Sequence, residues 1–157
     1  VASLFTKRWC HASYSSLSVF MLPSLMVGHA GICSDVKAIA VMLHRYGALA
    51  CFDYACVAPY IGIEMNWSAA PGTPTPACSV AESQLLCYLD AVYISAHKFT
   101  GGVGATGLLV AKRRLLTMQV PVSPGGGTVL FVSSDKQTYL DDIVAREEAG
   151  TPNIIGG

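Results

Sequence analysis

The sequence has few charged residues and no excess of either sign. Only 13% of its 157 residues are charged, against about 25% in a typical soluble domain, and ten Lys+Arg balance ten Asp+Glu. A nucleic-acid-binding protein carries a basic surplus that meets phosphate groups, so the zero net charge argues against that class. An intrinsically disordered chain combines low hydrophobicity with high net charge, and an apolar content of 52% excludes it.

The sequence also lacks a hydrophobic run long enough to span a membrane. A spanning helix needs about 20 consecutive apolar residues. The best candidate, Leu17–Val27, is much shorter and contains Pro23. Lys7 and Arg8 precede it in the manner of a weak signal peptide, but the rest of the chain is typical of an intracellular enzyme. We therefore predict a cytoplasmic protein with no membrane partner, and an organelle as the alternative compartment.

The six cysteines form no metal-ligand pattern. No two of them are spaced as CxxC, and no pair of histidines accompanies them, so the sequence predicts no metal site. Most lie inside apolar runs, where a free cysteine packs as a small hydrophobic residue. This usage is typical of a reducing compartment.

Hydrophobic patterning predicts an α/β fold. Apolar residues at helical spacing predict a helix over Ser34–Gly47, with Ser34 as N-cap and Gly47 as the stop. Continuous apolar runs are typical of strands covered on both faces. They predict strands at residues 48–52, 91–94, 107–111 and 128–132, with short helices at 82–89 and 139–148 and a surface loop at 68–79. This alternation favours a mostly parallel or mixed sheet with helices on both faces, in one domain or part of a larger one.

Polar residues gather where these segments end. Asp53 follows the first apolar run, Ser95, His97 and Lys98 follow the second, and Thr151 follows the last helix. Open α/β sheets bind their ligands at the carboxyl ends of strands. A lysine next to a buried strand would be partly desolvated, which favours the neutral amine that attacks an aldehyde. A carboxylate could hold a pyridine nitrogen, and the glycines after Lys98 would allow a close backbone approach.

Each of these residues also has a purely structural interpretation. Lys98 could be a solvated strand end, Asp53 the cap of the following turn, and His97 a hydrogen-bonded core histidine. Cys56 is interpreted as a small packing residue, and His44, near the end of its helix, as structural. A nucleotide-binding Rossmann domain is the weaker alternative, because no GxGxxG follows a first strand.

Four segments point to a known family. Leu89–Lys98, with Phe99–Val110 after it, resembles the lysine segment of the class V aminotransferases, which are pyridoxal-phosphate (PLP) enzymes that include cysteine desulfurases and selenocysteine lyases. Tyr46–Ala55 is similar to that family's aspartate-bearing strand. Further on, Pro124–Thr128 and Arg146–Asn153 are similar to the glycine turn and the "GT" segment, and all appear in family order.

The resemblance implies the PLP-dependent transferase large domain of fold type I, in incomplete form. Residues 1–30 would be a diverged N-terminal segment and residues 31–157 part of the PLP-binding domain, with the C-terminal small domain absent. Cys56 stands where many relatives have Gln or His, and no cysteine matches the persulfide-forming position of desulfurases.

The resemblance also implies residue roles. Lys98 would form a Schiff base with PLP and shuttle the substrate α-proton, Asp53 would pair with the ring nitrogen, and Ala55 would pack on the ring. Ser95 and His97 would bind the cofactor phosphate, and Thr151 would reach the phosphate of the neighbouring subunit in a homodimer. The implied activity is that of an aminotransferase, cysteine desulfurase or lyase acting on an amino acid. The alternative is a catalytically incompetent remnant that is structural or dimerising only.

Overall fold

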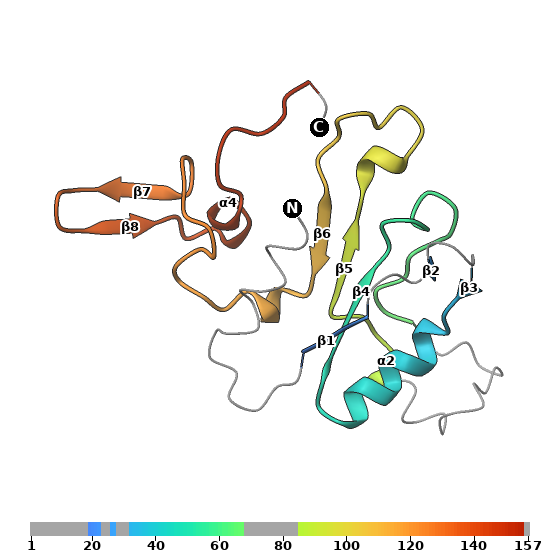
Figure 1. Cartoon of the computed structure of the whole chain (residues 1–157). Coiled ribbons are helices and arrows are strands. Elements are labelled where there is room, and N and C mark those ends of the chain that lie inside the picture. Colours follow the sequence, from blue (N-terminus) through green and yellow to red (C-terminus); the bar gives the residue numbers. More distant parts are fainter. Residues whose placement is uncertain (1–18, 23–25, 28–31, 68–84, 156–157) are drawn as a thin grey trace. The chain divides into compact units, whose positions relative to one another are not determined.

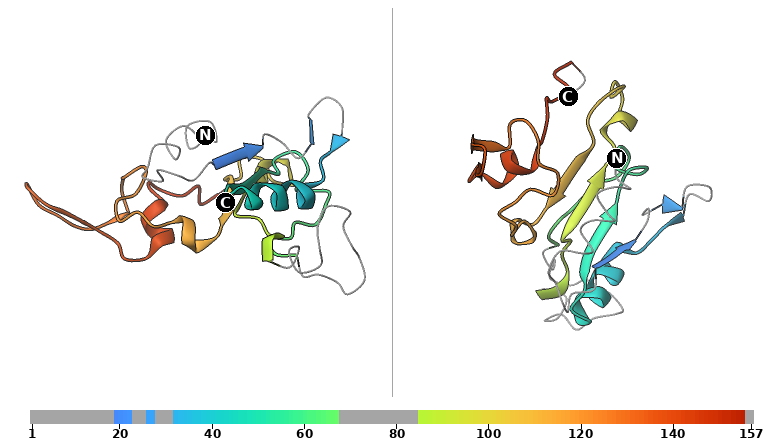
Figure 2. Two further views of the ribbon diagram at one scale, coloured as in Figure 1. Left: turned by 90° about the horizontal axis from the view of Figure 1, so that it is seen from below. Right: turned by 60° about the vertical axis from the view of Figure 1, so that its left-hand side comes forward.

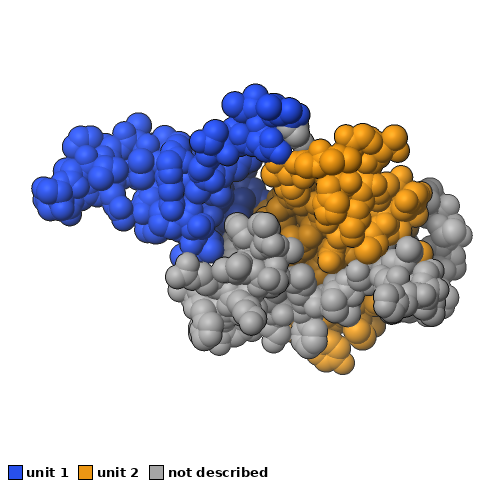
Figure 3. Space-filling view, turned by 45° about the horizontal axis from the view of Figure 1, so that its top comes forward, with its two compact units in different colours: residues 1–14, 113–155, 157 blue, residues 15–112, 156 orange. Residues whose placement is uncertain are grey.

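A computed structural model describes residues 19–22, 26–27, 32–67 and 85–155, and the side chains of 33–67 and 85–155. The described residues divide into two units, one before and one after the boundary between Lys112 and Arg113 (Figure 3). The predicted loop at 68–79 lies outside the described residues.

The first unit is built on a four-stranded mixed sheet, as Figure 1 shows. The strands lie in the order β1 (Val19–Leu22), β4 (Leu49–Asp53), β5 (Ala91–Ile94) and β6 (Leu108–Ala111). β1, β4 and β5 are parallel, whereas β6 runs antiparallel to β5. The expected mixed α/β sheet is therefore confirmed, and the apolar runs identified three of its four strands.

A separate antiparallel pair joins β2 (Met26–Val27) to β3 (Ile32–Cys33), directly ahead of helix α2 (Val36–Arg45). The helix confirms the expectation for this segment, but its N-cap is Asp35 rather than Ser34: Asp35 Oδ1 accepts a hydrogen bond from Ala38 N at 3.0 Å. Both residue types cap well, so composition could not decide between neighbours. Gly47, at φ +67°, ends the helical segment as predicted.

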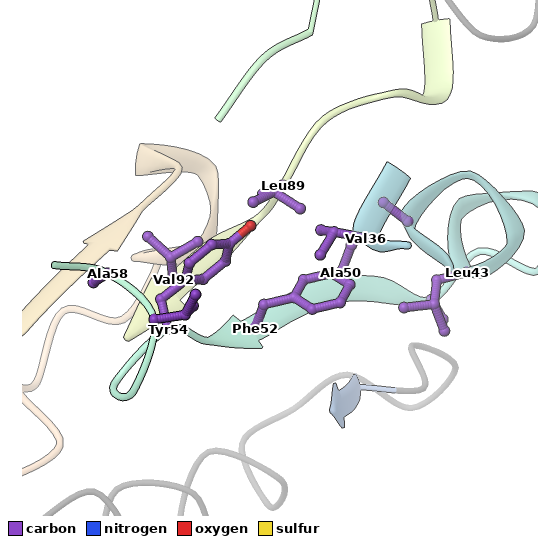
Figure 4. Close-up of a cluster of buried hydrophobic side chains, with 11 residues drawn as sticks. Val36, Leu43, Ala50, Phe52, Tyr54, Ala58, Leu89 and Val92 are labelled. Carbon is purple, nitrogen blue, oxygen red and sulfur yellow. The ribbon is translucent and has the colours of Figure 1, made fainter. Parts of the chain in front are cut away.

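The core of this unit lies between α2 and the two central strands (Figure 4). Val36, Ala40 and Leu43 form the buried face of the helix. Phe52 on β4 and Val92 on β5 are each 1% exposed. Because α2 follows β1 and leads into β4, it is the crossover between parallel neighbours, and burying its apolar face fixes β4 in the sheet.

The second unit contains the hairpin of β7 (Val129–Val132) and β8 (Gln137–Tyr139), followed by the short helix α4 (Ile143–Glu147). The views in Figure 2 show the hairpin as an extended ribbon. A strand at 128–132 is confirmed, but the expectation that it is buried is wrong, since Leu130, Phe131 and Val132 are more than half exposed. In the described part of this unit, no second layer covers these side chains of the two-stranded sheet.

The two remaining helix predictions need correction. The helix expected at 139–148 begins only after Asp142, whose Oδ1 caps Ala145 N at 2.8 Å, because Tyr139 pairs with Val129 in β8 instead. Of the helix expected at 82–89, residues 82–84 lie outside the described residues. Only residues 85 and 86 of the rest are helical, and Tyr88 forms an antiparallel bridge with Asn66. Among the described residues, no helix is long and apolar enough to cross a bilayer.

Candidate active site

Asp53 is the last residue of β4, and its carboxylate closes the turn after the strand. Asp53 Oδ1 accepts a hydrogen bond from Ala55 N at 2.7 Å, the two-residue Asx geometry that ends a strand in a tight turn. Asp53 therefore caps the following turn, but the helix that a helix N-cap would require is not there, because residues 55–60 form turns. The cap leaves the second oxygen available, because within the described part of the chain Oδ2 accepts no hydrogen bond.

Lys98 lies on a short 3₁₀ helix, Ala96–Lys98, immediately after β5. Ser95 begins this turn, and its carbonyl accepts from Lys98 N at 3.1 Å. The chain then folds back, since Gly102 N donates to Phe99 O at 2.9 Å. A Cβ at Gly102 would collide with the carbonyl of Ala96, so the turn requires glycine there. The sequence predicted that the glycines after Lys98 allow a close backbone approach. At Gly102 the group that comes close is the chain's own Ala96 carbonyl.

The parallel pairing of β4 with β5 brings these two turns to the same edge of the sheet. Asp53 is paired with Tyr93, and Tyr54 N donates to Tyr93 O at 2.8 Å just beyond the last pair. The carboxyl ends of both strands thus meet, as the sequence predicted for Asp53 and Lys98.

Cys56 also lies at this edge of the sheet, and the sequence did not predict its contact with Lys98. Lys98 Nζ donates to Cys56 Sγ at 3.3 Å, so the thiol contacts the amine directly. The interpretation of Cys56 as a mere packing residue is incomplete. Its position on the turn that begins at Asp53 is the signal that could have drawn attention to it.

The exposure of the site differs from what was expected. Lys98 and His97 are both exposed, whereas Asp53, Ala55 and Ser95 are half-buried. The expected partial desolvation of Lys98 is therefore wrong for the described residues, because β5 is buried at its start and half-buried at its end. The alternative that His97 is a core histidine is also wrong.

Thr151 is exposed and belongs to the unit formed by residues 113–155. Its expected contact with a phosphate in a neighbouring subunit stays a prediction. The roles expected for Ser95, His97 and Ala55 likewise remain predictions, although these residues share the sheet edge with Asp53 and Lys98.

Cys51, two residues before Asp53 on β4, is chemically different from Cys56. Its side chain is buried, and burial raises the pKa of the Cys51 thiol to about 12, with the nearby Asp90 carboxylate adding to the rise. A thiol in this state is almost entirely protonated near neutral pH and is a poor nucleophile. Cys51 is therefore a packing residue, as its apolar run indicated.

Comparison with known proteins finds similar sequences. The family model described as Aminotransferase class-V matches residues 84–157, which include β5, Lys98 and Thr151. A probable cysteine desulfurase of Chlamydia muridarum is 30% identical over 81% of this chain and 26% of its own length. One of Methanothermobacter thermautotrophicus is 32% identical over 80% of this chain and also 26% of its length.

Solved structures give the same fold. The cysteine desulfurase CsdA from Escherichia coli superposes with a TM-score of 0.61 at 26% identity, covering 88% of this chain and 29% of that one. The apo cysteine desulfurase of Thermococcus onnurineus NA1, at 24% identity and a TM-score of 0.56, supports the fold alone. The fold is thus that of the PLP-dependent enzymes of fold type I.

The chain is thus similar to the class V aminotransferase family in sequence and fold, as its lysine and aspartate segments suggested. It spans about a quarter of the length of the curated relatives it matches. This family is generally PLP-dependent. The side chains at the sheet edge suit that cofactor chemically, since an amine, a free carboxylate oxygen, a hydroxyl and an imidazole stand on two adjacent turns.

Proposed function

We propose that this chain forms the lysine and aspartate face of a PLP site in an enzyme acting on an amino acid, of aminotransferase, cysteine desulfurase or lyase type. The observation on which the proposal rests is the meeting of Asp53 and Lys98 at one edge of the sheet through the β4–β5 pairing. When bound, PLP supplies an electron sink that stabilises negative charge at the substrate α-carbon.

Each side chain at this edge of the sheet would have a different role in holding the cofactor or in the reaction. The Nζ amine of Lys98 is the group that can bond an aldehyde carbon and then hold or release a proton. Asp53 keeps Oδ1 on Ala55 N, so Oδ2 is the oxygen that can accept a hydrogen bond from a ring N–H. Ser95 and His97 offer an O–H and an N–H donor to a phosphate, and Ala55 offers a small apolar surface to a ring face.

Cys56 modifies the immediate surroundings of the amine. The hydrogen bond from Lys98 Nζ to Cys56 Sγ orients the amine toward the Asp53 turn. Sulfur is a weak acceptor, so this bond is readily exchanged for a covalent or hydrogen-bonded ligand. The hydrogen bond to Cys56 therefore holds the Lys98 amine beside the Asp53 turn. It competes only weakly with a ligand for the Lys98 nitrogen.

The proposal is tested by titrating the purified full chain with PLP and following visible absorption. We expect a new band in the wild type that is absent in Lys98→Ala. Lys136→Ala is the matched control, because Lys136 is also exposed but lies beyond residue 112, and it should behave as wild type. Absence of a band at saturating PLP, or an equal band in Lys98→Ala, would contradict the proposal.

A second candidate function is a catalytically incompetent, dimerising remnant of such an enzyme. The exposure of Lys98 and His97 favours it, because a reacting lysine is usually shielded from water. It predicts self-association in light scattering without a PLP-dependent band. Turnover of an amino acid by the purified chain would exclude this candidate.

A further inference from the structure

Asp90 is a fully buried carboxylate at the end of the sheet opposite the candidate site. Its side chain is 0% exposed, and it directly precedes β5. Asp90 Oδ2 accepts a hydrogen bond from Ala50 N at 2.8 Å and lies 2.9 Å from His44 Nε2. A buried charge is tolerated only when it is paired and hydrogen-bonded, so this arrangement has a definite structural cause.

His44, like Asp90, is buried and makes several contacts. Its side chain is 4% exposed, Nδ1 lies 2.6 Å from Leu86 O, and its ring stacks on Tyr88 at a centroid distance of 4.0 Å. The two ring nitrogens thus face two hydrogen-bond acceptors, a backbone carbonyl and a carboxylate. Lys112 Nζ lies over the same Tyr88 ring, 4.6 Å from its centroid.

The backbone of Asp90 joins the same elements. Asp90 N donates to Ala50 O at 2.9 Å, and Asp90 O accepts from Lys112 N at 2.9 Å. One residue therefore connects the end of α2, the start of β4 and the end of β6 at the point where β5 begins.

Such a connection is needed because the hydrophobic pattern of these strands does not define their register. Alternating apolar and polar residues penalise a one-residue slip by turning the apolar set to the wrong face. The segments Ala48–Phe52 and Ala91–Ile94 are apolar on both faces and lack that alternation. A slip would leave similar side chains buried, but it would move Asp53 relative to Lys98.

We propose that His44 and Asp90 are positioning residues that fix the register of β4 against β5 and thereby set the placement of Asp53 beside Lys98. A slipped register would leave the Asp90 carboxylate buried without Ala50 N or without His44, which is costly in a low-dielectric interior. The consequence for PLP rests on the proposed function, whereas the consequence for strand register does not.

The test compares Asp90→Asn with the wild type and with Asp35→Asn, a control with the same chemical change. Asp35 is the exposed N-cap of α2, and asparagine caps equally well. Amide hydrogen exchange of Tyr54, which donates to Tyr93 O in the correct register, reports the pairing without PLP. We expect Asp90→Asn to lose Tyr54 protection selectively, by about tenfold or more relative to amides inside α2, with Asp35→Asn unchanged.

The second readout is the dissociation constant for PLP, measured where circular dichroism shows each variant folded. We expect Asp90→Asn to weaken it by about tenfold and His44→Gln by less, because glutamine can still donate to the carboxylate. If Asp90→Asn does not fold, His44→Gln and His44→Ala supply the same comparison, with only His44→Ala losing Tyr54 protection. Unchanged Tyr54 protection in folded Asp90→Asn and His44→Ala would overturn the inference. A wild type without a PLP band would contradict the proposed function alone.

Discussion

Strands β4 and β6 are similar in sequence and opposite in environment. β4 contributes Cys51 and Phe52, which are 5% and 1% exposed, whereas Leu108, Leu109 and Val110 of β6 are 54%, 44% and 45% exposed. β4 has β1 and β5 on its two sides and α2 against it, but β6 is an edge strand of the described sheet. An apolar run therefore predicts a strand, while its burial depends on elements elsewhere in the chain or in another molecule.

The candidate site stands on the well-covered strands. Asp53 ends β4, and the turn of Lys98 follows β5, so both side chains extend from the part of the sheet that the core of α2, β4 and β5 holds in place. Sites on rigid elements hold their geometry better than sites on loops. The contrast between β4 and β6 thus leads to predictions that differ between the two strands.

The largest difference is expected for truncations in the two strands. Phe52→Ala should lower the free energy of unfolding by about 3–5 kcal/mol, because it removes a fully buried aromatic ring from the core. Leu109→Ala, on β6, should cost less than about 1.5 kcal/mol, since much of its side chain already meets solvent. Urea unfolding of both variants measures the two values, and equal losses would contradict the contrast between the strands.

Cys51 on β4 and Cys56 at the candidate site should differ in the rate at which their thiols react. With a pKa of about 12, Cys51 should react with iodoacetamide at pH 8 on the order of a thousandfold more slowly than an ordinary thiol. The raised pKa also makes the folded state bind its proton more tightly than the unfolded state, for which 9.0 is the ordinary value. Its contribution to stability is therefore complete below pH 9 and is lost as the pH rises from about 9 to 12.

Mass spectrometry of alkylated peptides checks this prediction, with half-buried Cys56 as the internal comparison. Labelling of Cys51 as fast as that of Cys56 in the folded chain would mean that β4 opens to solvent. In urea the two rates should become similar.

A smaller effect is expected where the chain turns back after Lys98. Gly102→Ala should cost about 1–3 kcal/mol, since the new methyl group would meet the Ala96 carbonyl and the turn would have to shift. Gly62→Ala is a suitable control, because no atom lies within 4 Å of a Cβ added there and Gly62 does not have a positive φ. Thermal unfolding of the pair tests the prediction, and equal melting temperatures would count against a rigid Lys98 turn.

The smallest effect is expected at Cys56. Cys56→Ser keeps a hydrogen-bond acceptor near Lys98 Nζ, while Cys56→Ala removes it. We expect Cys56→Ala to weaken PLP binding by a few-fold at most, consistent with the modest net value of one exposed hydrogen bond, and Cys56→Ser to stay near wild type. A loss of more than about a hundredfold in Cys56→Ala would assign the thiol a direct part in holding the cofactor.

Local sequence patterns were sufficient for the central part of this fold. The helical spacing in residues 34–47 and the apolar runs at 48–52 and 91–94 predicted α2, β4 and β5, because each pattern reflects contacts made by that segment itself. Asp53 and Lys98 were predicted as residues of the candidate site from their places after those strands and from the family resemblance.

The features that the sequence could not predict depend on contacts between distant segments. The exposure of β6 and β7, the contact of Lys98 with Cys56 and the burial of Asp90 against His44 each depend on residues far apart in the chain. The expected desolvation of Lys98 failed for the same reason, since a buried strand does not determine what covers the turn after it.

The central claim, that β4 and β5 place Asp53 and Lys98 together as a PLP site, is tested most directly by chemical trapping. The full chain is incubated with PLP, reduced with borohydride and digested, and the modified lysines are located by mass spectrometry. Modification concentrated on Lys98, and markedly reduced in Asp53→Ala, is the predicted result. Equal modification of Lys98 and of Lys37 and Lys136, the other lysines exposed among the described residues, with no effect of Asp53→Ala, would contradict the account.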